Sequence, residues 1–166
     1  MSDWFFMLGE PLSPSEREQV RDYVRELGVE HDMAVEQVSS WMLARDVITN
    51  QDWDRRFWDA ERLERQRLLG SAEALCGPLG VVQSLSRALE SSEAVYGAAA
   101  VEAARRNCTD LGFIGAAAGA ASEALHLAEL AELAGERLPH PFLLKKAVFA
   151  AGHWPLAAVG GRYFVF

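Results

Sequence analysis

The chain has 166 residues, of which 50% are hydrophobic and 24% are charged, a composition typical of one folded domain and not of a disordered or fibrous protein. Its 24 acidic and 16 basic residues give a net charge of −8. Because an excess of acid repels phosphate backbones, general nucleic-acid binding is disfavoured and a basic partner is favoured.

The absence of targeting features predicts a cytoplasmic protein. The N-terminus has neither the basic segment nor the apolar length of a signal peptide. The longest stretch without a charged residue, 147–161, spans 15 residues and contains Pro155, whereas a membrane helix needs about 20. Two cysteines, Cys76 and Cys108, lack the spacing of a zinc site or a disulfide framework, which predicts reduced, buried thiols. We therefore expect neither export nor membrane association.

The N-terminal segment combines an apolar run with the start of a helix. Residues 4–8 are rich in aromatic side chains and predict a short strand or an apolar arm. Ser13, Pro14 and Glu16 then match the N-cap, first-turn proline and capping-box positions of a helix. That helix is expected to run to about residue 27, before Gly28.

Two further helices are predicted in the middle of the chain. Apolar residues recur at helical spacing over 31–48. Asn50 or Asp52 can cap the next helix, which the Gly77-Pro78 pair should end, because proline lacks an N–H and disfavours helix in the residue before it.

The second half of the chain predicts four more helices, each placed by a capping residue or a helix breaker. They are expected over 79–90, over 93–106 after a serine cap, from 109 or 110 to 134, and over 139–151.

The C-terminal residues predict a β-hairpin, because two short apolar runs flank Gly160-Gly161. The N-terminal arm can supply a third strand. The predicted fold is therefore mainly α: one domain over 1–166, built as a single bundle of about six or seven helices with a small C-terminal β-hairpin at about 156–166.

Glu123 and His126 form the strongest metal-like pattern in the chain. They are three residues apart on a predicted helix, a spacing with which di-iron bundles bind metal. Such sites need two Glu-x-x-His pairs, and the sequence contains one. We therefore predict no metal site, with these two residues as weak candidates, and we predict neither a catalytic residue nor a cofactor.

Residues 52–69 mix five acids and five arginines, with aromatic residues at the N-terminal end. The pairs Asp52–Arg56 and Glu61–Arg65, each at i,i+4, favour a salt-bridged, exposed helix with its aromatic side chains in the core. Alternatively, Trp53 and Trp58 anchor a protein interface, because tryptophan and arginine are enriched among the residues that dominate binding energy.

Acidic residues are concentrated over 10–36, and this stretch would face a basic partner. Its candidate partner-binding residues are Glu18, Asp22, Glu26 and Glu30.

The C-terminal third resembles small immunity-like proteins of bacterial toxin/immunity competition systems. The residues that carry the likeness are Ala116–Ala121, His140-Pro-Phe142, Lys145-Lys146, Ala151-Gly-His-Trp-Pro-Leu156 and Tyr163–Phe166. The resemblance implies a cytoplasmic, non-enzymatic protein that binds and neutralises a cognate toxin.

Three classes of function are compatible with the sequence. The first is a non-enzymatic binding protein, an immunity protein with a cognate, basic protein toxin as its partner, acting as a monomer or small homo-oligomer. The alternatives are a helical metal- or ligand-binding enzyme and a regulatory subunit of a larger assembly. Small size, acidity and the lack of a catalytic motif favour the binding classes over the enzyme.

Overall fold

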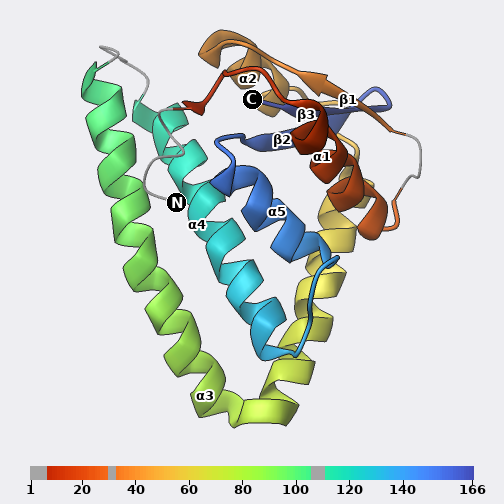
Figure 1. Ribbon diagram of the computed structural model, residues 1–166, viewed down its shortest axis with the longest axis vertical. Coiled ribbons are helices and arrows are strands. Elements are labelled where there is room, and N and C mark those ends of the chain that lie inside the picture. The colour runs from red at the N-terminus through yellow and green to blue at the C-terminus, as the bar shows by residue number, and fades with distance from the viewer. Residues whose placement is uncertain (1–6, 30–32, 106–110) are drawn as a thin grey trace.

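The computed structural model describes residues 7–29, 33–105 and 111–166 and is mainly helical (Figure 1). In these residues it contains five helices and three strands: α1 (Pro14–Glu26), β1 (Ala34–Gln37), α2 (Trp41–Ile48), α3 (Arg55–Arg105), α4 (Leu111–Leu133), α5 (Pro141–Ala150), β2 (Pro155–Val159) and β3 (Arg162–Val165). The N-terminal capping box is present as predicted, since Ser13 Oγ accepts from the Glu16 N–H and the Glu16 carboxylate accepts from the Ser13 N–H.

The predicted count of six or seven helices is somewhat too high, because α3 covers three predicted helices. The predicted break at Gly77-Pro78 is present as a kink inside α3, but the predicted break at Ser91 and Ser92 is not. Gly77 leaves the helical conformation, with φ 72° and ψ 161°, and Pro78 starts the helix again at a position where its missing N–H costs little. The serines expected to cap a new helix instead stay inside α3, where Ser91 Oγ and Ser92 Oγ donate to carbonyl oxygens one turn earlier. We call residues 55–76 the first arm of α3 and residues 78–105 the second arm.

The predicted helix over 31–48 is also wrong in its first half. Residues 34–37 form β1, and Val35 is buried in the sheet opposite Tyr163. The helix starts only at Trp41, where Ser40 Oγ accepts the N–H of Leu43 and so acts as the N-cap.

The hairpin is confirmed, and it belongs to a three-stranded sheet of order β1-β3-β2. β2 and β3 are antiparallel around Gly160 and Gly161, whose φ values of 56° and 76° are those of a type I′ turn. β1 pairs with β3 in parallel. Among the described residues, the third strand is therefore β1. Residues 4–6 of the N-terminal arm, which was expected to supply it, lie outside the described residues, and Leu8 is not in a strand.

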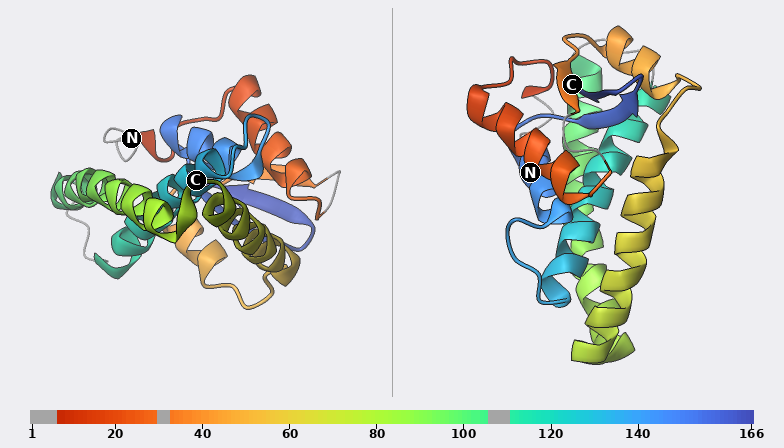
Figure 2. Two further views of the ribbon diagram at one scale, coloured as in Figure 1. Left: turned by 90° about the horizontal axis from the view of Figure 1, so that it is seen from below. Right: turned by 90° about the vertical axis from the view of Figure 1, so that its right-hand side faces the viewer.

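The helices pack around α4, which runs between the two arms of α3 and also contacts α5 (Figures 1 and 2). Close approach is possible because six α4 alanines are completely buried: Ala117, Ala118, Ala121, Ala124, Ala128 and Ala131. The sheet lies at one end of α4, with α1 and α5 packed together beside it.

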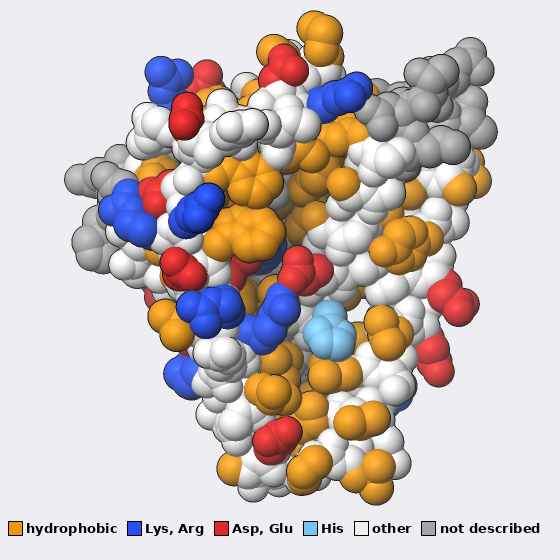
Figure 3. Space-filling view, turned by 180° about the vertical axis from the view of Figure 1, so that it is seen from behind, with side chains coloured by type: hydrophobic (Ala, Val, Ile, Leu, Met, Phe, Trp, Pro, Cys, Tyr) orange, Lys and Arg blue, Asp and Glu red, His pale blue; other side chains and the backbone are white. Residues whose placement is uncertain are grey.

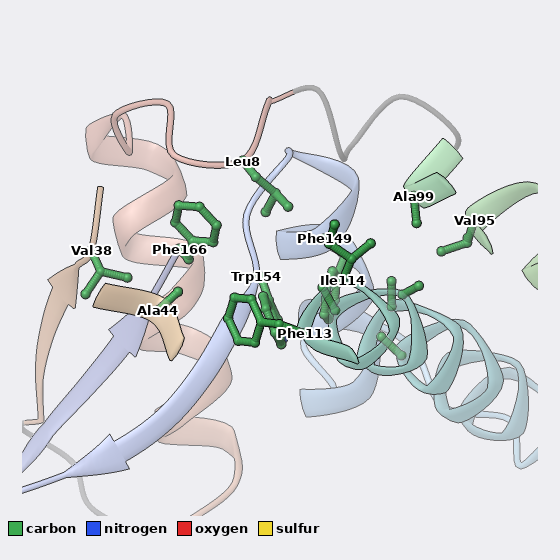
Figure 4. Packing of buried hydrophobic residues seen from close by; sticks show 14 residues of the cluster. Leu8, Val38, Ala44, Val95, Ala99, Phe113, Ile114, Phe149, Trp154 and Phe166 are labelled. Atoms are coloured by element: carbon green, nitrogen blue, oxygen red, sulfur yellow. The ribbon is translucent and has the colours of Figure 1, made fainter. Parts of the chain in front are cut away.

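Aromatic side chains join the sheet end to the helices (Figure 4). The ring of Trp41 lies 5.0 Å from that of Phe166 and 5.4 Å from that of Phe113, and Phe113 lies 5.3 Å from Trp154. Phe166 and Trp154 also exchange two backbone hydrogen bonds, which hold the C-terminal residue in this core. The C-terminal aromatics are thus structural.

Much of α3 is apolar and exposed. Leu75, Leu79, Val82 and Leu89 each expose 60% or more of their surface. By length and composition alone, the helical residues 55–102 could cross a membrane. Only 22% of their most apolar stretch is buried inside the protein. Cys76, expected to be buried, is a free and exposed cysteine of this surface, while Cys108 lies outside the described residues.

Candidate functional site

A hollow of about 560 Å³ opens between the first arm of α3, α4 and β2. Figure 3 shows it as a depression with hydrophobic side chains inside and charged side chains gathered beside it. Residues of α1, α2, α5 and β3, and of the segments just before α3 and β2, complete its lining. A volume of this size suits a small molecule or a few side chains of a partner protein.

Two stacked tryptophans form part of the wall of the hollow. The rings of Trp53 and Trp58 lie 5.8 Å apart and 28° from parallel. Trp53 is held in place, because its Nε1 donates to Val47 O at 2.9 Å and its backbone pairs with Val159 of β2. Trp58 exposes 65% of its surface. The core interpretation is therefore wrong for Trp58, although it holds for the neighbouring Phe57, which is 6% exposed.

Small residues on α4 create the space. Ala116 and Ala120, one helical turn apart, line the hollow with methyl groups opposite the first arm of α3. Trp154 and Leu156 close the hollow on the side next to the sheet. Larger side chains at the two alanine positions would fill the hollow.

A buried polar cluster lies at the other end of the lining. Oε1 of Glu61 accepts from Lys145 Nζ at 2.6 Å and from the Tyr23 hydroxyl at 2.5 Å. The side chain of Lys145 is 12% exposed and that of Glu61 is 22% exposed. Burial, together with the charge of Glu61, raises the pKa of both Tyr23 and Tyr163, so both hydroxyls stay protonated.

Two arginines of the first arm carry further charge into the lining. Arg65 pairs with Glu123 of α4, and Arg62 lies 3.3 Å from Asp59. The predicted i,i+4 pairs do not form. Glu61 pairs with Lys145 of α5 and Arg65 with Glu123 of α4. Arg56 pairs with Asp54, at 2.5 Å, and not with Asp52. The charged residues of this arm therefore tie α3 to α4 and α5.

The structure gives Glu123 a role other than metal binding. Its carboxylate pairs with Arg65. His126 is half-buried, and burial followed by the charge of Arg65 lowers its pKa. Within residues 7–29, 33–105 and 111–166, no group of three or more His, Cys, Asp or Glu side chains could hold a metal ion.

The predicted acidic surface lies on α1, apart from Glu30, which is outside the described residues. Glu18 pairs with Arg21, Asp22 with Arg25, and Glu26 lies 3.8 Å from Arg25. Each acid thus has an arginine of its own helix beside it. These residues do not line the hollow, whereas Trp53, Trp58 and Glu123 do.

Comparison of the chain with protein-family models, with curated protein sequences and with solved structures gives no significant match.

Sequence reasoning missed the polar cluster of the lining, namely Tyr23, Glu61 and Lys145. Tyr23 was inferable as an inward residue of α1 from the helical spacing of Val20, Tyr23 and Val24. Lys145 carried no such signal, because the sequence does not distinguish it from its neighbour Lys146. That lysine is 40% exposed and pairs with Glu132 at 3.4 Å.

Proposed function

We propose that this chain is a non-enzymatic binding protein, an immunity-type inhibitor that neutralises a cognate bacterial protein toxin, and that the toxin binds at the hollow. The observation that carries the proposal is the stacked pair of Trp53 and Trp58 at its wall. Trp58 exposes 65% of a large apolar side chain, yet the stacking and the hydrogen bond of Trp53 hold the pair in a defined geometry.

An exposed tryptophan stacked on a second tryptophan that is itself held in place is a favourable interface anchor beside a hollow. Tryptophan supplies a large contact area and loses little side-chain entropy when it is already held in place. The hollow next to the pair can receive a side chain of the partner, which would remove both surfaces from water. The resemblance of the C-terminal third to immunity-like proteins supports a toxin as that partner.

The charges of the hollow favour binding over catalysis. All four carboxylates in its lining are ion-paired: Asp54 with Arg56, Asp59 with Arg62, Glu61 with Lys145 and Glu123 with Arg65. A general base works best with a pKa near the working pH, whereas pairing with a cation stabilises the ionised carboxylate. Hydrogen bonds from Arg56 lower the pKa of Asp54 in this way.

The test is co-expression with the products of the open reading frames beside the gene. We expect one of them to arrest growth alone, and we expect this protein to restore growth and to co-purify with it. Trp58→Ala should weaken the complex about tenfold or more. Tyr96→Ala, which removes a 50% exposed aromatic residue of the second arm, is the matched control and should leave the complex intact. Failure of every neighbouring product to be neutralised, or equal binding by the two variants, would overturn the proposal.

The buried polar groups of the hollow favour one second candidate, a protein that binds a small organic molecule. Its lining includes polar groups that are largely buried, such as Lys145 and Tyr23, and such groups orient a ligand more readily than a flat protein surface. The two candidates share the hollow and differ in its occupant.

A further inference from the structure

We infer that the group received by the hollow is an amphipathic anion, an aromatic or branched apolar body that carries one carboxylate. The inference rests on the proposed use of the hollow as the binding site. Two features of the lining carry it: an excess of hydrogen-bond donors around Lys145, and an apolar wall beside them.

The donor excess follows from the hydrogen bonds of the cations. Lys145 uses one of its ammonium hydrogens for Glu61, and its Nζ lies 6.0 Å from the centroid of the Tyr23 ring. Its remaining donors have no further hydrogen-bond partner among the described residues. In the part of the chain that the structure describes, the side chain of Arg65 donates hydrogen bonds only to Glu123, and that of Arg62 only to Asp59 at 3.3 Å. A guanidinium has several donors, so both arginines can accept a further anion.

Glu61 does not satisfy Lys145 fully. The Oε1 atom that faces Lys145 also accepts the Tyr23 hydroxyl hydrogen bond, so its acceptor capacity is shared between two donors. At 12% exposure Lys145 is also poorly hydrated. A carboxylate that reached the ammonium group would replace lost water and gain from the low local dielectric.

Each of the four carboxylates of the lining already has a cation beside it, so a cationic ligand would have to compete with Arg56, Arg62, Arg65 or Lys145. The three cations of the lining are paired with carboxylates as well, so the attraction for an anion comes from the hydrogen-bond donors of Lys145, Arg62 and Arg65 that these pairs leave unused. These donors act within a chain whose net charge is −8.

The apolar part of the ligand would lie against Trp53, Phe57, Trp58 and Leu156, over the methyl groups of Ala120. Flat rings suit such walls, because aromatic faces stack well on tryptophan. A volume of about 560 Å³ holds an aromatic acid or the last one or two residues of a polypeptide. A free small acid and the carboxyl end of a partner chain share this chemistry.

The experiment compares ligand pairs that differ only in charge, with tryptophan fluorescence and calorimetry as readouts. The first pair is 3-phenylpropionate and its neutral amide, and the second is acetyl-Gly-Phe with a free carboxylate and its amide. We expect saturable binding of the acids, at least about tenfold tighter than that of the amides. Equal binding of acid and amide, or no saturable binding of any probe, would overturn the inference. Tighter binding of the peptide acid than of phenylpropionate would identify the end of a polypeptide as the occupant, and the reverse order a small acid.

Two variants locate the binding. Lys145→Met should weaken the binding of the acids at least about tenfold and leave the binding of the amides unchanged. The control Lys146→Met should bind both kinds of probe as the parent protein does. Ala120→Leu should abolish binding by filling the hollow, while Gly115→Leu adds the same side chain at a position of α4 with no atom within 4 Å to meet. Unchanged affinity in Ala120→Leu would overturn the inference even if Lys145→Met failed to fold.

The inference and the proposed function can fail separately. If Trp58→Ala disrupts a toxin complex but no acid binds, the inference is wrong and the function stands. If the acids bind in the hollow and no toxin is neutralised, the inference stands and the chain binds a small acid instead.

Discussion

His153 is the most deeply buried histidine among the described residues. It exposes 2% of its surface, its Nε2 lies 3.5 Å from Oε2 of Glu16, and its Nδ1 has no hydrogen-bond partner in the described part of the chain. Burial, opposed in part by Glu16, lowers the pKa of His153 below its ordinary value of 6.5. The folded protein therefore takes up this proton less readily than the unfolded chain.

We expect the free energy of unfolding to decrease as the pH falls below about 6.5, because the unfolded chain is protonated first. The stability that neutral His153 contributes is fully present above that pH. It stops decreasing only at a pH low enough to protonate His153 in the folded protein as well. The pKa of Glu16 is lowered mainly by the hydrogen bond from the Ser13 side chain. Glu16 therefore affects the free energy of unfolding only at a pH below its ordinary pKa of 4.5, outside the range of the His153 effect. Urea unfolding at a series of pH values between about 7.5 and 5.5 measures the slope.

His153→Gln should flatten this slope. Burial also lowers the pKa of His126, so His126→Gln measures how much this second histidine contributes to the slope. An unchanged slope in His153→Gln would assign the pH dependence to other groups.

Neighbouring residues of the same type show what sequence cannot reveal at this scale. Lys145 is 12% exposed and bonds Glu61, which is 84 positions away, while Lys146 is 40% exposed on the same helix. The tryptophans were recognised as candidates from their type. Their surroundings depend on contacts between distant segments, which no local pattern specifies.

At the scale of single elements, the capping box of α1 offers a sharp test. Ser13 Oγ accepts the Glu16 N–H at 3.3 Å and the Glu16 carboxylate accepts the Ser13 N–H at 2.7 Å. Ser13→Ala should lower the free energy of unfolding by about 1 kcal/mol, because it leaves a helix N–H without its acceptor. Ser15→Ala, two residues away on the same exposed turn, removes only a contact with Ser13 Oγ and should have a smaller effect. Equal losses in chemical denaturation would contradict a capping role.

The C-terminal strand should be needed for stability. Phe166 is 1% exposed, contacts Trp41 and pairs with Trp154 through two backbone hydrogen bonds. Phe166→Ala should cost about 3–5 kcal/mol by leaving a cavity in the core. Phe164, only partly buried, provides the control, and Phe164→Ala should cost clearly less. Comparable melting temperatures for Phe166→Ala and the parent protein would show that the strand is a dispensable arm.

Elements with local signals were predicted, and those that depend on tertiary contacts were not. Caps, prolines and paired glycines located α1, α5 and the hairpin. β1 was mistaken for helix because its four residues are stabilised by pairing with β3, more than 120 positions away. The break at Gly77-Pro78 was located correctly, whereas the length of the second arm of α3 was missed because serines inside a helix carry the same local signal as helix caps.

At the scale of the whole molecule, charge acts over longer distances than the ion pairs do. Glu18, Asp22 and Glu26 of α1 each lie beside an arginine, so their local fields are partly cancelled, yet the chain retains a net charge of −8. This net charge, and not any single residue, would attract a basic toxin before contact. Its effect therefore belongs in the rate of association.

We expect salt and mutation to separate steering from anchoring. The Debye length falls from about 8 Å in physiological salt to about 3 Å at 1 M, so raising the salt concentration should slow association with the toxin and change dissociation little. Replacing Glu18, Asp22 and Glu26 by their neutral amides removes three charges and changes the net charge from −8 to −5. Association should slow about three- to tenfold at low salt. Trp58→Ala should instead speed dissociation, because it removes a contact made only in the complex.

A matched variant decides whether α1 faces the partner. Its three substitutions remove the same charge from exposed positions of α3: Glu73→Gln, Glu90→Gln and Glu93→Gln. If α1 lies nearer to the bound toxin, the α1 variant should associate more slowly than the α3 variant at low salt. The two association rates should converge at 1 M salt, because a Debye length of about 3 Å screens both sets of charges. Equal rates at low salt would mean that only net charge matters, and association rates that do not respond to salt would rule out a basic partner.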